Sequence, residues 1–149
     1  ETPFAEGMDR VCYFLKDLSM PKGAAQDHVA KRIMRDETEA AYFYDCATHI
    51  MAGALAKQFS ALNVSKWKLS FTNHFVFEFT KRVHPDTQGP VYMTVESYMP
   101  GLMKHFQADT SCHFCGGTLD ATGMYSISEA FSHFTSYVSG KSFVVLDLQ

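Results

Sequence analysis

The beginning of the chain alternates between polar and apolar residues in the manner of β-strands. Residues 11–16 alternate, Pro21-Lys22-Gly23 interrupts the pattern, and residues 28–34 resume it. Neighbouring proline and glycine favour a turn, and both flanking runs have ordinary strand length. The pattern predicts an N-terminal hairpin.

A helical repeat follows the hairpin. Asp36 and Glu39 have the spacing of a capping box at a helix start. Apolar residues then recur every three or four positions, which predicts one buried face on a long helix that ends near Phe59. This face comprises Phe43, Ala47, Ile50, Met51, Ala54 and Leu55.

Residues 67–80 change to a period of two, which predicts a strand with a buried aromatic face and a solvated polar face. The aromatic face carries Phe75, Phe77 and Phe79, and Asn73 is expected to kink the strand. Turn-forming residues 85–90 precede the returning strand at residues 91–95.

The pattern changes again after Glu96. Pro100-Gly101 ends the strand, and residues 109–123 form a polar loop. Ser126 and Glu129 have capping-box spacing and start a short amphipathic helix, which ends near residue 138. The apolar run at residues 143–146 predicts a strand buried on both faces.

These elements predict an α+β fold of two lobes, in which an antiparallel sheet carries one long helix. We expect an N-lobe over residues 1–95, and a hinge with the first part of a C-lobe over residues 96–149. The cleft between the lobes is expected near residues 96–101.

Composition narrows the possible partners. Hydrophobic residues make up 46% of the 149 positions, enough for a core, and the net charge of −3 gives no reason to expect nucleic acid or an anionic membrane. No apolar stretch is long enough to span a bilayer.

Four cysteines are too few for a disulfide framework, so we expect a reducing, cytoplasmic setting. The first residues lack an initiator Met and a signal-peptide pattern, as expected for an excerpt of a longer chain.

Several residues could carry phosphoryl-transfer chemistry, which needs a backbone loop and a cation on the phosphates, a metal clamp and an acid. Lys31 lies mid-strand, where it could neutralise phosphate or simply be solvated. Gly7 and Arg10 flank a turn that could cover phosphates, or form an ordinary turn. Asp147 follows the last apolar run and shares a strand face with Gln149, so it could serve a metal or substrate, or cap a turn.

Three other features leave alternatives open. Glu96, at the lobe boundary, could accept a hydrogen bond from the adenine amino group or be a solvated strand-end residue. Cys112 and Cys115 have zinc-knuckle spacing, but a structural zinc usually needs a second pair, so an ordinary loop is favoured over a zinc-binding domain. The histidines, including His49 and His74, show no metal-ligand spacing.

The order of several motifs resembles the catalytic domain of the alpha-kinase family, a group of atypical protein kinases. Pro3-Phe4-Ala5-Glu6-Gly7 with Arg10 resembles its opening, and Val29-Ala30-Lys31 its ATP-lysine strand. A third segment is similar to the family's hinge: Val95-Glu96-Ser97-Tyr98-Met99-Pro100-Gly101. The most specific resemblance lies in a pair of motifs, Ala130-Phe131-Ser132-His133-Phe134-Thr135 and Asp147-Leu148-Gln149.

The resemblance implies an ATP- and Mg²⁺-dependent serine/threonine kinase that acts on a protein substrate. Lys31, Arg10 and the Gly7 turn would contact the ATP phosphates, Glu96 would bind the adenine amino group, and Tyr98 would lie beside adenine. Asp147 would be the catalytic acid and Gln149 a magnesium ligand. The conventional multi-glycine, His-Arg-Asp and Asp-Phe-Gly signatures are not found.

The sequence departs from the family pattern in two places. The loop at residues 105–125 lacks the family's usual asparagines, and the family continues after its Asp-Leu-Gln with a second metal-binding aspartate, a glycine-rich loop and a zinc module. We therefore expect these 149 residues to be inactive in isolation, with exposed apolar surface. The alternative function is a pseudokinase that binds nucleotide or acts as a scaffold, although Lys31, Glu96, Asp147 and Gln149 are all chemically competent.

Overall fold

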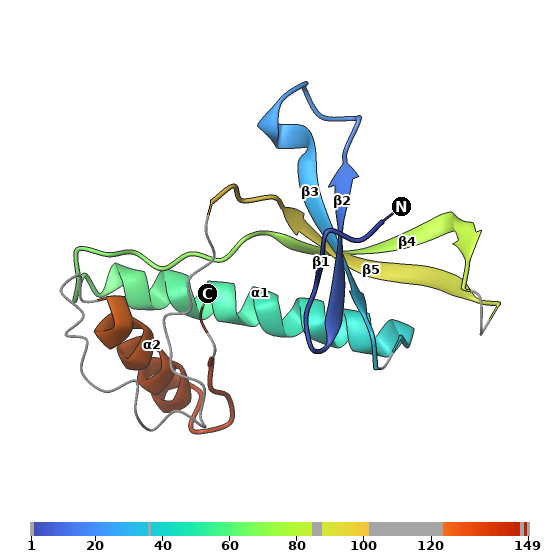
Figure 1. Ribbon diagram of the computed structural model, residues 1–149. Helices are drawn as coiled ribbons and strands as arrows, with labels where there is room; N and C mark the ends of the chain where they lie inside the picture. Colours follow the sequence, from blue (N-terminus) through green and yellow to red (C-terminus); the bar gives the residue numbers. More distant parts are fainter. Residues whose placement is uncertain (1, 36, 85–87, 102–123, 147, 149) are drawn as a thin grey trace. The chain divides into compact units, whose positions relative to one another are not determined.

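The computed structural model describes residues 2–35, 37–84, 88–101, 124–146 and 148 (Figure 1). The elements follow in the order β1 (Ala5–Glu6), β2 (Arg10–Lys16), η1 (Ala24–Gln26), β3 (Asp27–Ile33), α1 (Glu39–Ala61), β4 (His74–Val83), β5 (Pro90–Ser97) and α2 (Met124–Val138). The predicted hairpin, long helix, returning strand and short helix are confirmed. No helix among the described residues combines the length and apolar character needed to cross a bilayer.

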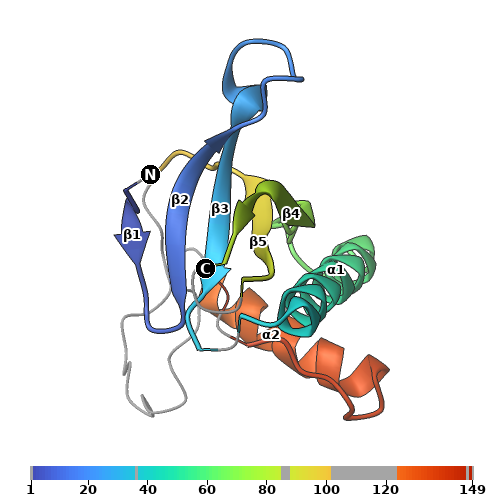
Figure 2. The ribbon, with the colours of Figure 1, turned by 90° about the vertical axis from the view of Figure 1, so that its right-hand side faces the viewer.

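The five strands form one sheet in the order β1-β2-β3-β5-β4, and every neighbouring pair is antiparallel (Figure 2). The sheet and its helices make the fold α+β, as predicted. Lys31 lies in the central strand β3, opposite Cys12 of β2 and Thr94 of β5. A central strand is hydrogen-bonded on both edges, which makes it a rigid support for a functional side chain.

The described residues form two compact units, each considered separately below. The first comprises Glu1–Met51 and Phe71–Pro100, and the second comprises Ala52–Ser70 and Gly101–Gln149. The division therefore falls inside α1 rather than only at the hinge. The proposed lobes, 1–95 and 96–149, remain a prediction.

Side-chain alternation divides the sheet into two faces. Ala30 is opposite Tyr13 and Val95, and a buried cluster of Ala30, Met93 and Val95 forms the core of this face. Lys31 points to the other face, since successive residues of a strand alternate. We call the face that carries Lys31 the lysine face.

Strand β4 corrects the prediction for residues 67–80. It begins at His74 rather than Trp67, and at its start the burial is the reverse of the prediction: the His74 side chain is only 2% exposed, whereas Phe75 and Phe77 are 48% and 39% exposed. Further along the strand, Phe79 packs against the buried cluster, as the pattern predicts. His74 points to the lysine face, where Cys46 of α1 donates a hydrogen bond from Sγ to the His74 carbonyl oxygen at 3.3 Å. Helix α1 therefore covers the face that the pattern assigned to solvent.

Helix α1 itself buries a different face from the predicted one. Phe43, Ile50 and Met51 are exposed, and the buried positions are Tyr42, Cys46, Ala52, Ala56 and Phe59. Apolar residues occur on several sides of this helix, so the periodic pattern alone does not identify the face that packs.

In the second unit, Phe59 packs against Phe131 and Phe134 of α2, with ring centroids 5.5 and 5.3 Å apart. The predicted strand at residues 143–146 is wrong, because this segment pairs with no strand in the described part of the chain and Val144 and Leu146 are exposed. The Val145 backbone is bound instead by side chains of α2: Thr135 Oγ1 accepts from its N–H at 3.0 Å, and Ser132 Oγ donates to its carbonyl at 2.6 Å.

Candidate nucleotide-binding site

The predicted lysine and glutamate meet on the lysine face. Lys31 Nζ forms an ion pair with Glu96 Oε1 of the adjacent strand β5, and their side chains are 23% and 16% exposed. A partly buried charge is stable only with a partner, so each side chain holds the other in place. Two residues that lie far apart in the sequence thus form one ion pair.

His74 and Asp45 extend this pair toward β2. His74 lies directly opposite Glu96 in the β4–β5 pairing, with its Nδ1 3.4 Å from Glu96 Oε2 and its Nε2 3.6 Å from Asp45 Oδ2. Asp45, on α1, also forms an ion pair with Arg10 of β2. These contacts form a chain in which basic and acidic side chains alternate, which we call the charge chain: Arg10, Asp45, His74, Glu96 and Lys31.

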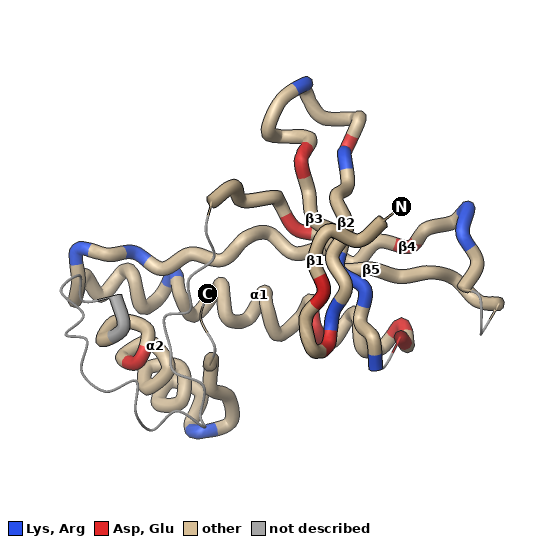
Figure 3. The backbone as a smooth tube through the Cα atoms, viewed as in Figure 1, with Lys and Arg blue, Asp and Glu red and all other residues tan. Residues whose placement is uncertain are grey.

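The charge chain connects four strands and α1 across one face of the sheet. Figure 3 marks the basic and acidic positions along the strands and α1. Two of the residues at its ends, Arg10 and Lys31, are those that the resemblance assigns to phosphates. The structure brings them to the same face.

The environment shifts the pKa of the three central groups. Burial acts to raise the pKa of Glu96, but contacts with His74 and Lys31 outweigh it and lower the pKa to about 2. Burial likewise acts to raise the pKa of Asp45, but the contact with His74 and the charge of Arg10 outweigh it and lower the pKa. Burial acts to lower the pKa of His74, but the two carboxylates outweigh it and raise the pKa. Both carboxylates are therefore ionised at neutral pH, and the imidazole is more readily protonated than a free histidine.

Two more residues support the charge chain. Thr72 Oγ1 donates to Glu96 Oε2 at 3.0 Å. His49 of α1 stacks on His74, with ring centroids 4.2 Å apart, and its Nε2 lies 2.9 Å from the Thr72 carbonyl oxygen. Burial, followed by the charge of His74, lowers the pKa of His49.

His49, His74 and Glu96 each offer a ligand atom within 4.8 Å of the others. A metal ion would have to compete there with the Lys31 ammonium for Glu96 and with a readily protonated His74. Metal ligation requires neutral imidazole, so this group suits a charge network better than a metal site.

The remaining described candidates lie at the ends of strands. Gly7 occupies the turn between β1 and β2, where its N–H donates to the Arg10 carbonyl oxygen at 2.9 Å. Tyr98 follows β5, donates from its N–H to the Asp27 carbonyl at 2.9 Å, and contacts Phe14 edge to face. Asp147, Gln149, Cys112 and Cys115 lie outside the described residues.

Sequence reasoning missed the centre of the charge chain. Asp45 received no role from the sequence, and the alternation of residues 67–80 puts His74 on the face that was predicted to be solvated. The available signal was an acid on the helix that follows the lysine strand, combined with a histidine at the start of the next strand. The sequence positions of Asp45 and His74 do not indicate that their side chains meet.

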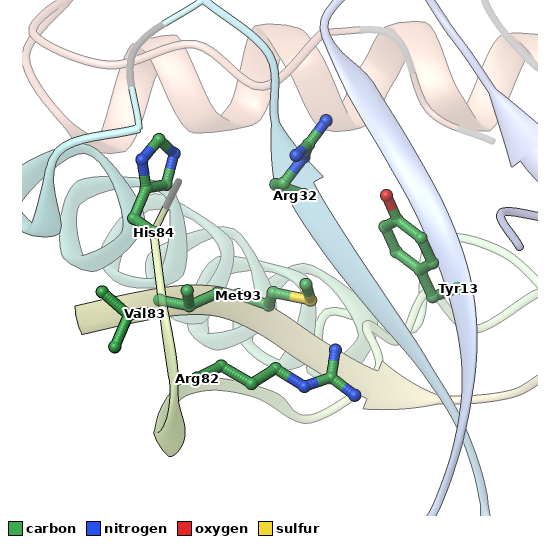
Figure 4. Close-up of a pocket in the computed structure, with 7 residues that line it drawn as sticks. Tyr13, Arg32, Arg82, Val83, His84 and Met93 are labelled. Carbon is green, nitrogen blue, oxygen red and sulfur yellow. The ribbon is translucent and has the colours of Figure 1, made fainter. Parts of the chain in front are cut away.

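A separate cavity of about 350 Å³ lies on the opposite face of the sheet. Tyr13, Arg32, Arg82 and His84 are its polar lining residues (Figure 4). Arg32 and Tyr13 alternate with Lys31 and Cys12, so their side chains lie on the face away from the charge chain. The cavity is therefore distinct from the candidate site.

Comparison with known proteins bears on the family of the chain. The model of the alpha-kinase family matches residues 5–149. Alpha-protein kinase 1 of Dictyostelium discoideum is 31% identical over 99% of this chain and 10% of its own length, and myosin heavy chain kinase B of the same organism is 26% identical over 99% and 18%. Eukaryotic elongation factor 2 kinase of Caenorhabditis elegans is 29% identical over 98% and 18%. The chain thus spans less than a fifth of each of these relatives.

Solved structures agree on the fold. The apoenzyme alpha-kinase domain of myosin-II heavy chain kinase A has a TM-score of 0.73 at 21% identity, with 99% of this chain and 67% of that domain covered. An inactive form of the same domain complexed with ATP has a TM-score of 0.76 at 22% identity, with 100% and 69% covered. The family match over nearly the whole chain, together with this fold, confirms the resemblance read from the motifs: the chain belongs to the alpha-kinase family.

Proposed function

We propose that this chain forms the nucleotide-binding part of an ATP-dependent protein kinase that transfers the γ-phosphate to serine or threonine of a protein substrate. The observation that carries the proposal is the Lys31–Glu96 ion pair, held partly buried at the centre of the sheet. A fixed cation on a rigid strand suits the phosphates of a nucleotide. Relatives named as kinases, and a related domain complexed with ATP, support the same activity.

The resemblance assigns these residues to the two ends of a nucleotide triphosphate. Lys31 and Arg10 would neutralise phosphate oxygens from one face of the sheet, and the Gly7 turn would cover them with backbone. Glu96 and Tyr98, on and just after β5, would bind the adenine end.

The acid and the metal ligand complete the proposal. Asp147 would orient the acceptor hydroxyl, and the Gln149 side-chain oxygen would bind Mg²⁺, which prefers oxygen ligands. Bound Mg²⁺ would neutralise charge on the phosphates. Because the chain spans 67–69% of the solved domains quoted above, we propose that residues 1–149 alone do not turn over ATP. We also propose a cytoplasmic setting, which suits the free thiols of Cys12 and Cys46.

The test compares two lysine variants of the full-length protein. Lys31→Met removes the proposed phosphate cation, whereas Lys16→Met removes a strand lysine whose ion pair with Asp27, at 2.9 Å, is largely exposed. We expect Lys31→Met to lower phosphate transfer by about 10²-fold or more, because it removes charge that stabilises the transition state. Lys16→Met should retain activity.

The measurement is transfer of labelled γ-phosphate to casein, with phosphoamino-acid analysis and a parallel ATP-binding titration. Equal activity in Lys31→Met and the unmodified protein would refute the role of Lys31. ATP binding without transfer to any residue would favour the alternative, a pseudokinase. Phosphate on residues other than serine and threonine would refute the proposed specificity.

A further inference from the structure

His74 connects the two cations that the proposed function assigns to phosphates. Lys31 pairs with Glu96, and Arg10 pairs with Asp45. Both of these carboxylates face the same imidazole ring, one on each nitrogen. The two cations are therefore not independent, because each depends on a carboxylate that His74 also holds.

Several charged or titratable groups among the described residues lie around His74. Arg10 and Cys12 lie on β2, Lys31 on β3, Glu96 on β5, and Asp45, Cys46 and His49 on α1. Among these described groups, only Arg10 and Lys31 carry a positive charge that could compensate Asp45 and Glu96. The neighbouring His49 resists protonation, since burial and the charge of His74 lower its pKa.

ATP binding would redistribute these charges. Phosphate oxygens that contact Lys31 and Arg10 would compete with Glu96 and Asp45 for the charge of these two cations. Each carboxylate would then have less compensating charge, which is unfavourable for a partly buried carboxylate, and His74 is the described basic side chain that faces both. Protonation of His74 would compensate both.

We propose that His74 is a positioning residue that holds Glu96 and Asp45 while ATP binds Lys31 and Arg10, and that nucleotide binding is coupled to uptake of a proton on the His74 imidazole. The proton comes from solvent and binds the ring nitrogen that carries no hydrogen in the neutral tautomer. This inference rests on the proposed function, since it requires ATP at the lysine face.

The coupling has a definite sign. Weaker pairing of the two carboxylates in the complex would raise the pKa of His74 further, so the complex holds more proton than the free protein. ATP affinity should therefore be highest at low pH and decline as pH rises through the pKa of His74 in the free protein. Above the pKa of His74 in the complex, the dependence should end.

The experiment measures proton uptake by calorimetry on the full-length protein. ATP is titrated at pH 8, where its own phosphates are ionised, in two buffers of different ionisation enthalpy. We expect net uptake of a fraction of a proton by the unmodified protein. His74→Gln, which keeps a polar side chain but cannot be charged, should show no uptake and bind ATP about tenfold more weakly.

His28→Gln is the matched control, because His28 lies in the same sheet but its Nδ1 faces a backbone carbonyl, that of Gln26, at 3.0 Å. It should retain both uptake and affinity. Titration of the His74 ring by NMR with and without ATP provides a readout that needs no variant, and the pKa should rise in the complex.

The outcomes separate the two proposals. ATP binding without proton uptake, or with the same uptake in His74→Gln, would overturn the role of His74 and leave the kinase assignment intact. Failure of the unmodified protein to bind ATP would overturn both. If His74→Gln does not fold, an unchanged His74 pKa in the NMR titration would still reject the coupling.

Discussion

At Gly7 the fold leaves room for a side chain. A Cβ placed there would meet nothing closer than the Arg10 carbonyl oxygen at 3.9 Å, an ordinary contact. Gly140, after α2, differs because its φ of 61° lies in the left-handed region that favours glycine. The backbone conformation therefore favours glycine at position 140, whereas at position 7 the proposed approach of phosphate to the backbone explains it better.

This contrast predicts opposite effects for two alanine variants. Gly7→Ala should leave the melting temperature unchanged and weaken ATP binding by about three- to tenfold, because the methyl group obstructs a phosphate. Gly140→Ala should lower stability by about 1 kcal/mol without changing ATP affinity. Calorimetric unfolding and ATP titration measure both. A stability loss in Gly7→Ala with normal affinity would assign that glycine to the fold.

At the scale of elements, α2 holds the segment that leads toward Asp147. Thr135 and Ser132, both buried, bind the N–H and carbonyl of Val145. These side chains replace the strand partner that the apolar run at residues 143–146 would otherwise need. The position of this segment therefore depends on two hydroxyl groups of a helix.

Replacing one hydroxyl should test this support. Thr135→Val keeps the shape of the side chain but leaves the Val145 N–H without its acceptor, which should cost about 1–3 kcal/mol of unfolding free energy. Ser126→Ala, at an exposed position of the same helix, is the control and should cost far less. Chemical denaturation measures both variants. Equal losses would show that the Thr135 hydroxyl does not support the segment.

At the scale of the whole molecule, the charge chain sets the pH range of stability. The pKa of Glu96 falls from 4.5 to about 2 on folding, so its contribution is complete above pH 4.5 and is lost as pH falls toward 2. The pKa of His74 rises above 6.5, so its contribution is complete below pH 6.5 and is lost as pH rises through the folded value. Stability should therefore be greatest between these limits.

The variant Glu96→Gln tests the loss of stability at acid pH. The variant removes a carboxylate whose shift is worth at most about 3 kcal/mol, so its stability should decline less between pH 4.5 and 2 than that of the unmodified protein. Glu78→Gln, exposed on β4, should retain the original profile. Denaturant unfolding across this pH range provides the measurement. Parallel profiles for all three proteins would exclude Glu96 as the source.

Local pattern alone determined much of this protein. Turn residues and the alternation on either side of them located β2, β3 and β5, because these features depend on backbone conformation within a few residues. Capping-box spacing came near both helix starts but did not give the caps: Thr38 Oγ1 accepts from the Ala41 N–H at the start of α1, and α2 begins at Met124, before Ser126. The ordered motifs indicated the family, and the lysine and glutamate of the candidate site were identified in the same way.

Only the tertiary structure decided which faces meet. Helix α1 has apolar residues on several sides and β4 alternates clearly, yet α1 covers the side of β4 that carries His74 and leaves Phe75 and Phe77 exposed. The pairing of His74 with both Asp45 and Glu96 joins residues from α1, β4 and β5. Sequence periodicity reports which residues share a face of one element, whereas the partner of that face depends on contacts among distant segments.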